Sequence, residues 1–354
     1  MNSTSDQAAR AGSFSVDSTI GAIKAAVPPK FAGWPELDNV GVRFHPKELS
    51  LIAARTGHGK TTALLNIFMN WLEAHPDQSF VFYSLELPVD AVFLKLLSLA
   101  IRRAFGATYS FYSLKDFIHD GVLPGSGGPA DAETIERGIS LIRDLENRMQ
   151  IVYQPDWHAL EFAAHARAEM VARNGSVGGL LIDYLQLMAP PPGQYERRDL
   201  EVSAAARVLK KLSVELGCPV VAAAQLTREA IGHSVIPSGR TFDALPVQEA
   251  IRHRRPQLHH LRDGGSEQEA DLVLGILNYR ADFVSEREDA SQSDRIESGP
   301  IDVSVLKNRY GNLGVVSMVL EGEAGYIRGL GFRERLATQQ TDPAVTARLT
   351  GTGE

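Results

Sequence analysis

The stretch LSLIAARTGHGKTTALLNIF, residues 49–68, decides the fold. It opens as an apolar run, passes through a turn that contains Gly57 and Gly59, and continues with a helical pattern. The segment from Ala54 to Thr62 matches the phosphate-binding loop GxxxxGK[ST], with Ala54 in the first glycine position. A strand, such a loop and a helix in this order predict an α/β domain that binds a nucleotide. A chance glycine-rich turn is the bland alternative.

The residue types in this loop suit the chemistry of phosphate binding. Glycines let backbone N–H groups turn toward phosphate oxygens, and the helix N-terminus adds its positive end. We expect Lys60 to reach the β- and γ-phosphates and the Thr61 hydroxyl to ligate Mg²⁺. The predicted nucleotide-binding residues are Ala54, Arg55, Thr56, Gly57, His58, Gly59, Lys60, Thr61 and Thr62.

Outward from this loop, short apolar runs alternate with longer helical patterns. The predicted strands are 49–54, 80–85, 149–153, 179–184 and 219–226, and the predicted helices lie near 60–74, 89–104, 131–147, 158–173 and 199–215. Strands that are apolar throughout and alternate with helices indicate a mostly parallel sheet with helices on both faces. Apolar runs around 271–280, 300–309 and 315–322 predict further strands that extend this sheet.

Composition narrows the class of protein. The chain has 354 residues, of which 44% are hydrophobic and 22% charged, which is typical of a globular protein. Its net charge of -7 means that binding to nucleic acid must come from a local basic patch. The single cysteine, Cys218, permits no intrachain disulfide. We find no membrane-spanning run or signal-peptide pattern and expect a cytoplasmic protein.

Three polar residues at predicted strand ends complete a candidate site for nucleotide hydrolysis. Asp183 ends the strand 179–184, where a carboxylate can reach the metal. Glu86 follows another apolar strand and is placed to orient or deprotonate the attacking water. Gln225 either senses the γ-phosphate by a hydrogen bond or simply caps its strand. A solvated carboxylate at a strand end is the alternative for each acid.

Five segments together resemble a known family. These are YSLE (83–86), LLIDYLQLM (180–188), AAAQLTR (222–228), LRDGGSEQEAD (261–271) and VSVLKNRYGNLG (303–314). Their order and context are similar to those of the DnaB-like replicative helicases, from about Gly33 to Gly331. The resemblance implies a RecA-like ATPase that uses ATP and Mg²⁺ and encircles single-stranded DNA as a homo-oligomeric ring, expected to be a hexamer.

The resemblance also implies roles for individual residues. Lys307 and Arg309 match a KxR motif that completes the ATP site of the neighbouring subunit, with Arg309 as the arginine finger; a solvated hairpin charge pair is the alternative. Arg262, Asp263 and Gly265 match the loop that holds DNA phosphates, a kind of contact that positions a strand without reading its bases.

The sequence departs from the family pattern in ways that bear on partners. Only about 30 residues precede the predicted motor, so we expect the N-terminal domain that engages primase to be absent, and the loader or primase partner stays open. We therefore expect an N-terminal tail with a short helix over 1–32, the RecA-like motor over 33–335 and a C-terminal tail over 336–354. The apolar positions Val16, Ile20, Ile23 and Val27 predict that short helix, which either packs on its own chain or docks on a partner.

Two further features leave alternatives open. The segment RHRRPQLHH (252–260) is either a basic lip for nucleic acid or a solvated charged loop. The predicted function is an ATP-dependent DNA helicase or translocase motor. The alternative is a ring ATPase of the same fold that acts as a loader or regulator, in a mobile element or in defence, without unwinding DNA.

Overall fold

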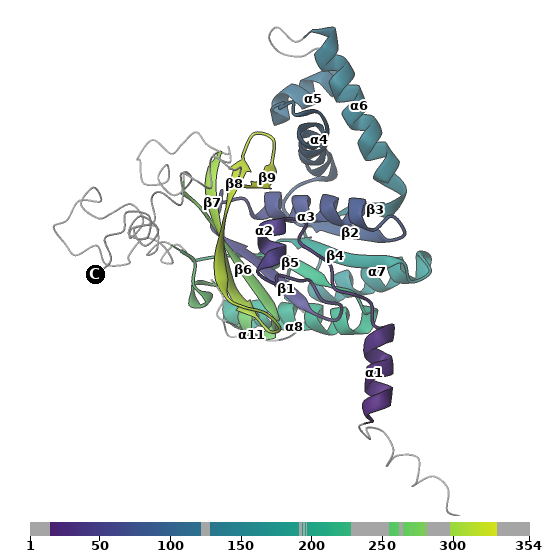
Figure 1. Cartoon of the computed structure of the whole chain (residues 1–354), viewed down its shortest axis with the longest axis vertical. Helices are drawn as coiled ribbons and strands as arrows, with labels where there is room; N and C mark the ends of the chain where they lie inside the picture. The colour runs from purple at the N-terminus through teal and green to yellow at the C-terminus, as the bar shows by residue number, and fades with distance from the viewer. Residues whose placement is uncertain are drawn as a thin grey trace, which may run out of the picture.

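A single sheet organises the molecule. The computed structural model describes residues 15–121, 128–190, 193, 195, 197–227, 255–261, 265–279, 281 and 298–330. Within these residues, nine strands form one sheet in the order β3-β2-β4-β5-β1-β6-β7-β8-β9 (Figure 1). The strands are β1 (Leu49–Ala54), β2 (Ser79–Ser84), β3 (Met149–Tyr153), β4 (Val177–Asp183), β5 (Val220–Gln225), β6 (Leu272–Asn278), β7 (Gly299–Asn308), β8 (Gly314–Glu321) and β9 (Tyr326–Gly329).

Helices connect the strands and cover both faces. The helices are α1 (Val16–Ala25), α2 (Pro35–Asn39), α3 (Lys60–Ala74), α4 (Val89–Phe105), α5 (Phe111–Asp120), α6 (Pro129–Leu145), α7 (Ala159–Ala172), α8 (Arg198–Leu216) and α11 (Ser266–Glu269). Helices α3 and α4 lie on one face of the sheet, while α7 and α8 lie on the other (Figure 1). The predicted α/β class, with a mostly parallel sheet and helices on both faces, is confirmed.

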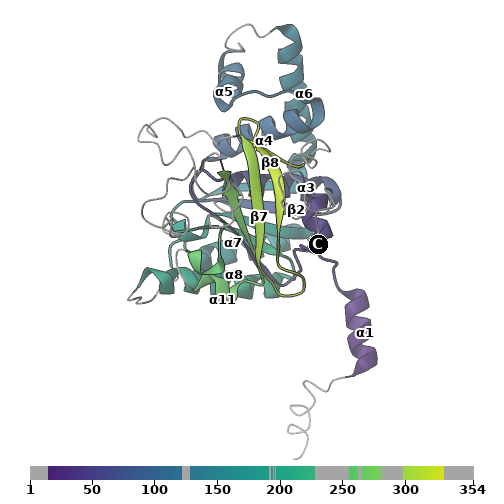
Figure 2. The same ribbon diagram turned by 60° about the vertical axis from the view of Figure 1, so that its left-hand side comes forward.

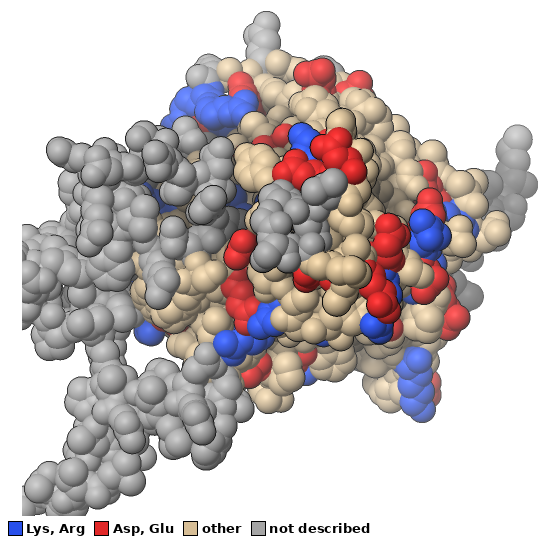
Figure 3. All heavy atoms as spheres, turned by 90° about the horizontal axis from the view of Figure 1, so that it is seen from above, with Lys and Arg blue, Asp and Glu red and all other residues tan. Residues whose placement is uncertain are grey.

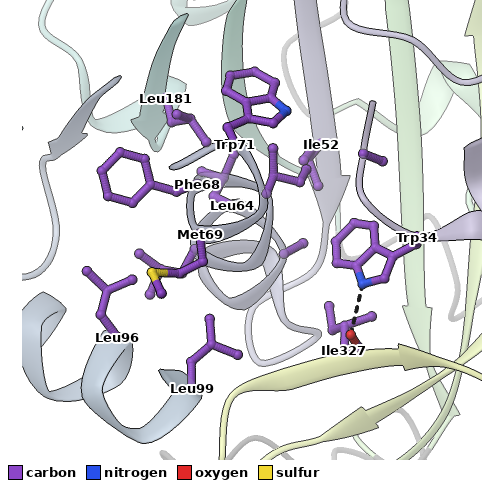
Figure 4. Close-up of a cluster of buried hydrophobic side chains, with 14 of the residues drawn as sticks. Trp34, Ile52, Leu64, Phe68, Met69, Trp71, Leu96, Leu99, Leu181 and Ile327 are labelled. Carbon is purple, nitrogen blue, oxygen red and sulfur yellow. Dashed lines mark hydrogen bonds between the residues drawn. The ribbon is translucent and has the colours of Figure 1, made fainter. Parts of the chain in front are cut away.

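Strand β1 shows why the sheet is buried on both faces. All six of its residues are buried, and successive side chains point to opposite faces. Leu49 and Leu51 join the core beneath α7 and α8, whereas Ile52 and Ala54 join the core beneath α3 and α4. In the core beneath α3 and α4, Trp71 and Phe68 of α3 pack toward Leu181 (Figure 4). At the side of the same core, the Trp34 indole N–H donates to the Ile327 carbonyl at 2.8 Å.

The strands that follow β5 in the chain complete the sheet, and most of them are antiparallel to their neighbours. β6 is parallel to β1, but β7, β8 and β9 run antiparallel to their neighbours. The strands predicted over 271–280, 300–309 and 315–322 therefore do extend the sheet. The sequence pattern missed the short strand β9 and the helix α5.

The N-terminal helix α1 stands away from the rest of the described chain in two views (Figures 1 and 2). It has no buried residue, and Val16, Ile20, Ile23 and Val27 are 45–69% exposed. The predicted helix is present, and of the two alternatives the described residues show no packing on its own chain. Its apolar positions are presented to solvent.

Candidate nucleotide-binding site

The phosphate-binding loop follows the carboxyl end of β1 and leads directly into α3. Gly57 and Gly59 have φ values of +77° and +93°, a left-handed conformation that other L-residues adopt at a cost. A Cβ on Gly57 would meet nothing within 4 Å, so the backbone conformation, not space, requires glycine there. Gly59 immediately precedes α3, which places the helix N-terminus at the loop.

Lys60 folds back across this loop. Its ammonium group donates to the Arg55 carbonyl at 3.1 Å and lies 5.7 Å from the centre of the Tyr184 ring. Burial lowers the pKa of Lys60, while the negative charges of Asp183 and Glu86 oppose the shift. The lysine therefore lies within electrostatic reach of both predicted acids.

Asp183 ends β4 beside the loop. Its Oδ2 accepts a hydrogen bond from the Thr61 hydroxyl at 2.7 Å, and the residue is fully buried. Burial raises the pKa of Asp183 to about 6, against the opposing effects of Thr61 and Lys60. Its Oδ1 is buried and has no hydrogen-bond partner among the described residues. A buried carboxylate oxygen left without a partner beside a threonine hydroxyl fits a hard cation such as Mg²⁺.

Glu86 and Gln225 lie at the same edge of the sheet. Ser84, the last residue of β2, pairs with Asp183, and Glu86 follows two residues later with an exposed side chain. Gln225, the last residue of β5, pairs with Ala54, and its side-chain amide donates to the Thr56 hydroxyl at 3.0 Å. We call this the P-loop edge, defined by the carboxyl ends of β1, β2, β4 and β5.

His58 occupies a different place from that expected for a loop residue. Its side chain is 2% exposed, and its Nδ1 accepts a hydrogen bond from the Asn278 backbone N–H at 3.1 Å. Burial lowers its pKa to about 3, and the neighbouring Arg55 and Lys60 lower it further. The neutral imidazole thus ties the loop to the end of β6, and its ring faces the protein rather than a ligand.

Lys95 is a charged residue near the site that the sequence pattern did not single out. Burial lowers its pKa, and the negative charges of Asp183 and Glu86 oppose this shift. It lies on α4, the helix that follows Glu86. The sequence feature that could have indicated Lys95 is its position as the one charged residue in the apolar run FLKLLSLA, residues 93–100.

Lys307 and Arg309 lie far from this site within one chain. β6 begins beside the start of β1, where Ser50 pairs with Leu272, and the end of β7 lies there too, where Leu272 pairs with Asn308. Arg309 therefore lies at the amino end of β1 and Lys60 at its carboxyl end, about 20 Å apart for six residues of strand. We call this the Arg309 edge, defined by the amino ends of β1 and β6 and the carboxyl end of β7.

Of the predicted DNA loop, Arg262 and Asp263 lie outside the described residues. Gly265 is described and directly precedes α11, so the loop leads into the Arg309 edge. In the basic segment 252–260, Arg255 forms an ion pair with buried Asp302 at 2.8 Å. This arginine is engaged by its own chain, whereas Arg252 and Arg254 of the same segment lie outside the described residues.

A glycine loop, its lysine and a threonine–aspartate pair at one edge of a mostly parallel sheet define a P-loop nucleotide-binding domain of RecA-like type. The family model for the DnaB-like helicase C terminal domain matches residues 31–234. The chain belongs to this family.

Relatives and solved structures agree with this assignment. The chain is 28% identical over 295 residues to the replicative DNA helicase DnaB of Pasteurella multocida, covering 82% of this chain and 53% of that protein. It is 30% identical over 291 residues to that of Leifsonia xyli, with the same coverage. The chain thus spans about half the length of these relatives.

Two solved structures share the fold. One is a DnaB-like replicative helicase studied with primase, at TM-score 0.69 and 22% identity, covering 92% of this chain and 70% of that chain. The other is an isolated ATPase domain, at TM-score 0.67 and 23% identity, covering 94% of this chain and 100% of that chain. Among the described residues, no helix is both long and apolar enough to cross a bilayer.

Proposed function

We propose that this chain is an ATP-dependent motor that moves on single-stranded DNA as a homo-oligomeric ring, with six subunits as the expected number. The observation that carries the proposal is the separation of two sets of residues within one chain. The P-loop edge holds Lys60 and Asp183, whereas Arg309 lies at the opposite edge of the sheet. Subunits packed head to tail would bring the Arg309 edge of one against the P-loop edge of the next, and such contacts form a ring when the rotation from one subunit to the next closes on itself.

The residues of the P-loop edge suit phosphoryl transfer from ATP to water. The Gly57–Gly59 turn and the start of α3 would bind the phosphates, and Lys60 would hold the β- and γ-phosphates. Glu86, exposed at the same edge, would accept a proton from the attacking water or orient it. Gln225, hydrogen-bonded to Thr56, would link the loop to the end of β5.

Mg²⁺ fits this edge because Asp183 presents a buried oxygen without a partner next to Thr61. Thr61 and Asp183 would hold the ion, which neutralises phosphate charge when bound. Lys60 shares that task with its own positive charge.

Measurement of DNA-stimulated ATP hydrolysis, followed by unwinding of a forked duplex, tests the proposal. We expect both activities in the wild type and neither in Lys60→Ala, while Lys115→Ala, which removes an exposed lysine of α5, keeps both. Native mass measurement with ATP and single-stranded DNA gives the number of subunits. Stimulated hydrolysis without unwinding would favour a ring ATPase that acts as a loader or regulator instead.

DNA binding is expected to depend on Arg262 rather than on Arg255. Acidic and basic side chains are interspersed in small groups over the described part of one face (Figure 3), so a local contact must supply the affinity. For single strands, the logarithm of affinity falls against log salt by about 0.7 for each phosphate neutralised. We expect Arg262→Ala to reduce the slope by about 0.7, with homopolymers of different base affected alike.

Arg255→Ala serves as the matched control, because Arg255 is held by Asp302. It should lower thermal stability but leave the salt slope unchanged. Equal slopes for the wild type and Arg262→Ala would remove Arg262 from the DNA contact.

A further inference from the structure

Asp271 lies at the centre of the Arg309 edge. It is 1% exposed and directly precedes β6. Its Oδ2 accepts hydrogen bonds from the Lys210 ammonium at 2.6 Å and from the Leu49 backbone N–H at 3.1 Å. Its Oδ1 lies 2.8 Å from Nη1 of Arg309 in an ion pair. Lys210 and Leu49 fix this carboxylate in place, so it is a rigid partner for Arg309.

Asp271 holds Arg309 at two points. Besides the ion pair, the Asp271 carbonyl accepts a hydrogen bond from the Arg309 backbone N–H at 3.0 Å. The Arg309 side chain is nevertheless 53% exposed, so part of it remains at the surface. An unrestrained arginine side chain loses rotamer entropy when it is ordered. A fixed carboxylate restricts that motion before any neighbour is met.

The surrounding residues single out Asp271 as the anchor. Glu48 is a second buried acid near Arg309, but burial and the charge of Asp271 raise its pKa to about 7. Lys307 is engaged elsewhere, since its ammonium donates to the Glu267 carbonyl at 2.7 Å. Within the described part of the chain, Arg309 forms its ion pair with Asp271.

We propose that Asp271 is the positioning residue for Arg309: it orients the guanidinium at the subunit surface so that the nucleotide of a neighbouring subunit meets it. This inference rests on the proposed function, in which Arg309 acts in trans. It predicts that Asp271 matters in the subunit that donates Arg309 and not in the subunit that hydrolyses ATP.

Mixed rings test this placement. Lys60→Ala subunits keep Arg309, and Arg309→Ala subunits keep the phosphate-binding loop, so each variant alone is inactive and rings containing both regain some ATP hydrolysis. Native mass measurement verifies that both variants are present in each ring. Absence of any recovery in such rings would contradict the trans role of Arg309 itself, and the positioning role would fall with it.

Asp271→Asn is then added to one subunit type at a time. In the Lys60→Ala subunit, which donates Arg309, it should reduce the recovered activity at least tenfold. In the Arg309→Ala subunit, the same substitution should leave the recovered activity unchanged, which also shows that the variant folds and assembles. If the Lys60→Ala and Arg309→Ala mixture is active and Asp271→Asn has the same effect in either subunit type, the positioning role is overturned. The trans role of Arg309 would remain intact.

Two further variants guard against a purely structural effect. Asp271→Glu keeps the charge but moves the carboxylate outward by one methylene group, and it should show the same dependence on placement if Asp271→Asn folds poorly. Lys210→Met removes one of the groups that fix the Asp271 carboxylate, so it should show the same dependence on placement with a smaller loss. Equal losses in both placements for both Asp271 variants would mean that Asp271 only stabilises the fold.

Discussion

The two edges of the sheet each bury an aspartate, and the two aspartates differ in the cations that the chain places beside them. Asp183 at the P-loop edge accepts one hydrogen bond from Thr61 and keeps a buried oxygen without a hydrogen-bond partner among the described residues. Oδ1 of Asp271 at the Arg309 edge likewise has no hydrogen-bond partner among the described residues. A cation nevertheless lies beside each of its oxygens, Lys210 at 2.6 Å and Arg309 at 2.8 Å.

This difference follows from where each carboxylate finds its positive charge. A buried carboxylate is costly unless it is paired, and burial raises the pKa of Asp183 to about 6. The chain supplies the compensating charges at the Arg309 edge. At the P-loop edge, under the proposed function, a bound cation would supply part of the compensation. Asp183 therefore has fewer compensating charges in its own chain than Asp271.

The largest expected effect comes from Arg309, the half-exposed arginine that pairs with Asp271. An arginine finger contributes about 10³–10⁵ in rate to related phosphoryl transfers. Arg309→Ala should lower DNA-stimulated kcat to a similar extent and leave ATP binding by each subunit nearly unchanged. The control is Arg207→Ala, since Arg207 is 62% exposed and pairs with Glu269 near the same edge. A kcat within tenfold of wild type would make Arg309 an ordinary surface charge.

Glu86→Gln tests the catalytic side of the P-loop edge. General base catalysis contributes about 10²–10⁴ in rate, so kcat should fall by that factor while ATP binding persists, because the phosphate-binding loop is intact. Hydrolysis and nucleotide binding are measured separately. Glu133→Gln, at an exposed position of α6, is the control. Turnover near the wild-type level in Glu86→Gln would remove this residue from the mechanism.

The two aspartates themselves should respond to the same substitution with opposite signs. The folded pKa of Asp183 is raised above its unfolded value, so stability falls as the pH rises from about 4 to about 6, and the full cost is present at pH 7.5. Asp183→Asn should therefore raise the melting temperature of the nucleotide-free protein by a few degrees at pH 7.5. Asp271→Asn should lower stability by about 2 kcal/mol, because two cations lose a charged hydrogen-bond or ion-pair partner.

Thermal unfolding without nucleotide measures both aspartate variants. Shifts of the same sign would mean that the two carboxylates are compensated alike, against the geometry of the two edges.

The smallest expected effect concerns pH and the ring of His58. Because its folded pKa is about 3 and the unfolded value is about 6.5, the unfolded state binds an extra proton between these values. This residue's contribution makes stability fall as the pH drops below 6.5, with a slope of up to about 1.4 kcal/mol per pH unit. His58→Met should remove this part of the slope.

Urea unfolding at pH 7.5 and pH 5 measures the change for His58→Met. His119→Met, at an 81% exposed side chain, should keep the slope of the wild type. An unchanged slope in His58→Met would show that burial does not hold the imidazole neutral.

Sequence pattern predicted the parallel half of the sheet better than its later half. The runs that became β1 and β3 were predicted at their actual bounds. For β1 the reason is that a strand buried on both faces is continuously apolar. β9 has four residues, of which one is buried, so it carries too little apolar signal. α5 buries only Leu114 and Phe117, and its apolar stripe is too short to mark a helix.

By itself, the sequence determined the phosphate-binding loop and the residues around it, since Gly57, Gly59, Lys60 and Thr61 are neighbours along the chain and their spacing is their geometry. The family resemblance also rested on local segments. Which side chains meet across the sheet was decided by the tertiary structure alone. Asp271 binds Lys210 and Arg309 from 61 and 38 positions away in the chain. His58 turns toward Asn278, 220 positions along the chain, because strand order and register, which no local pattern contains, place β6 next to β1.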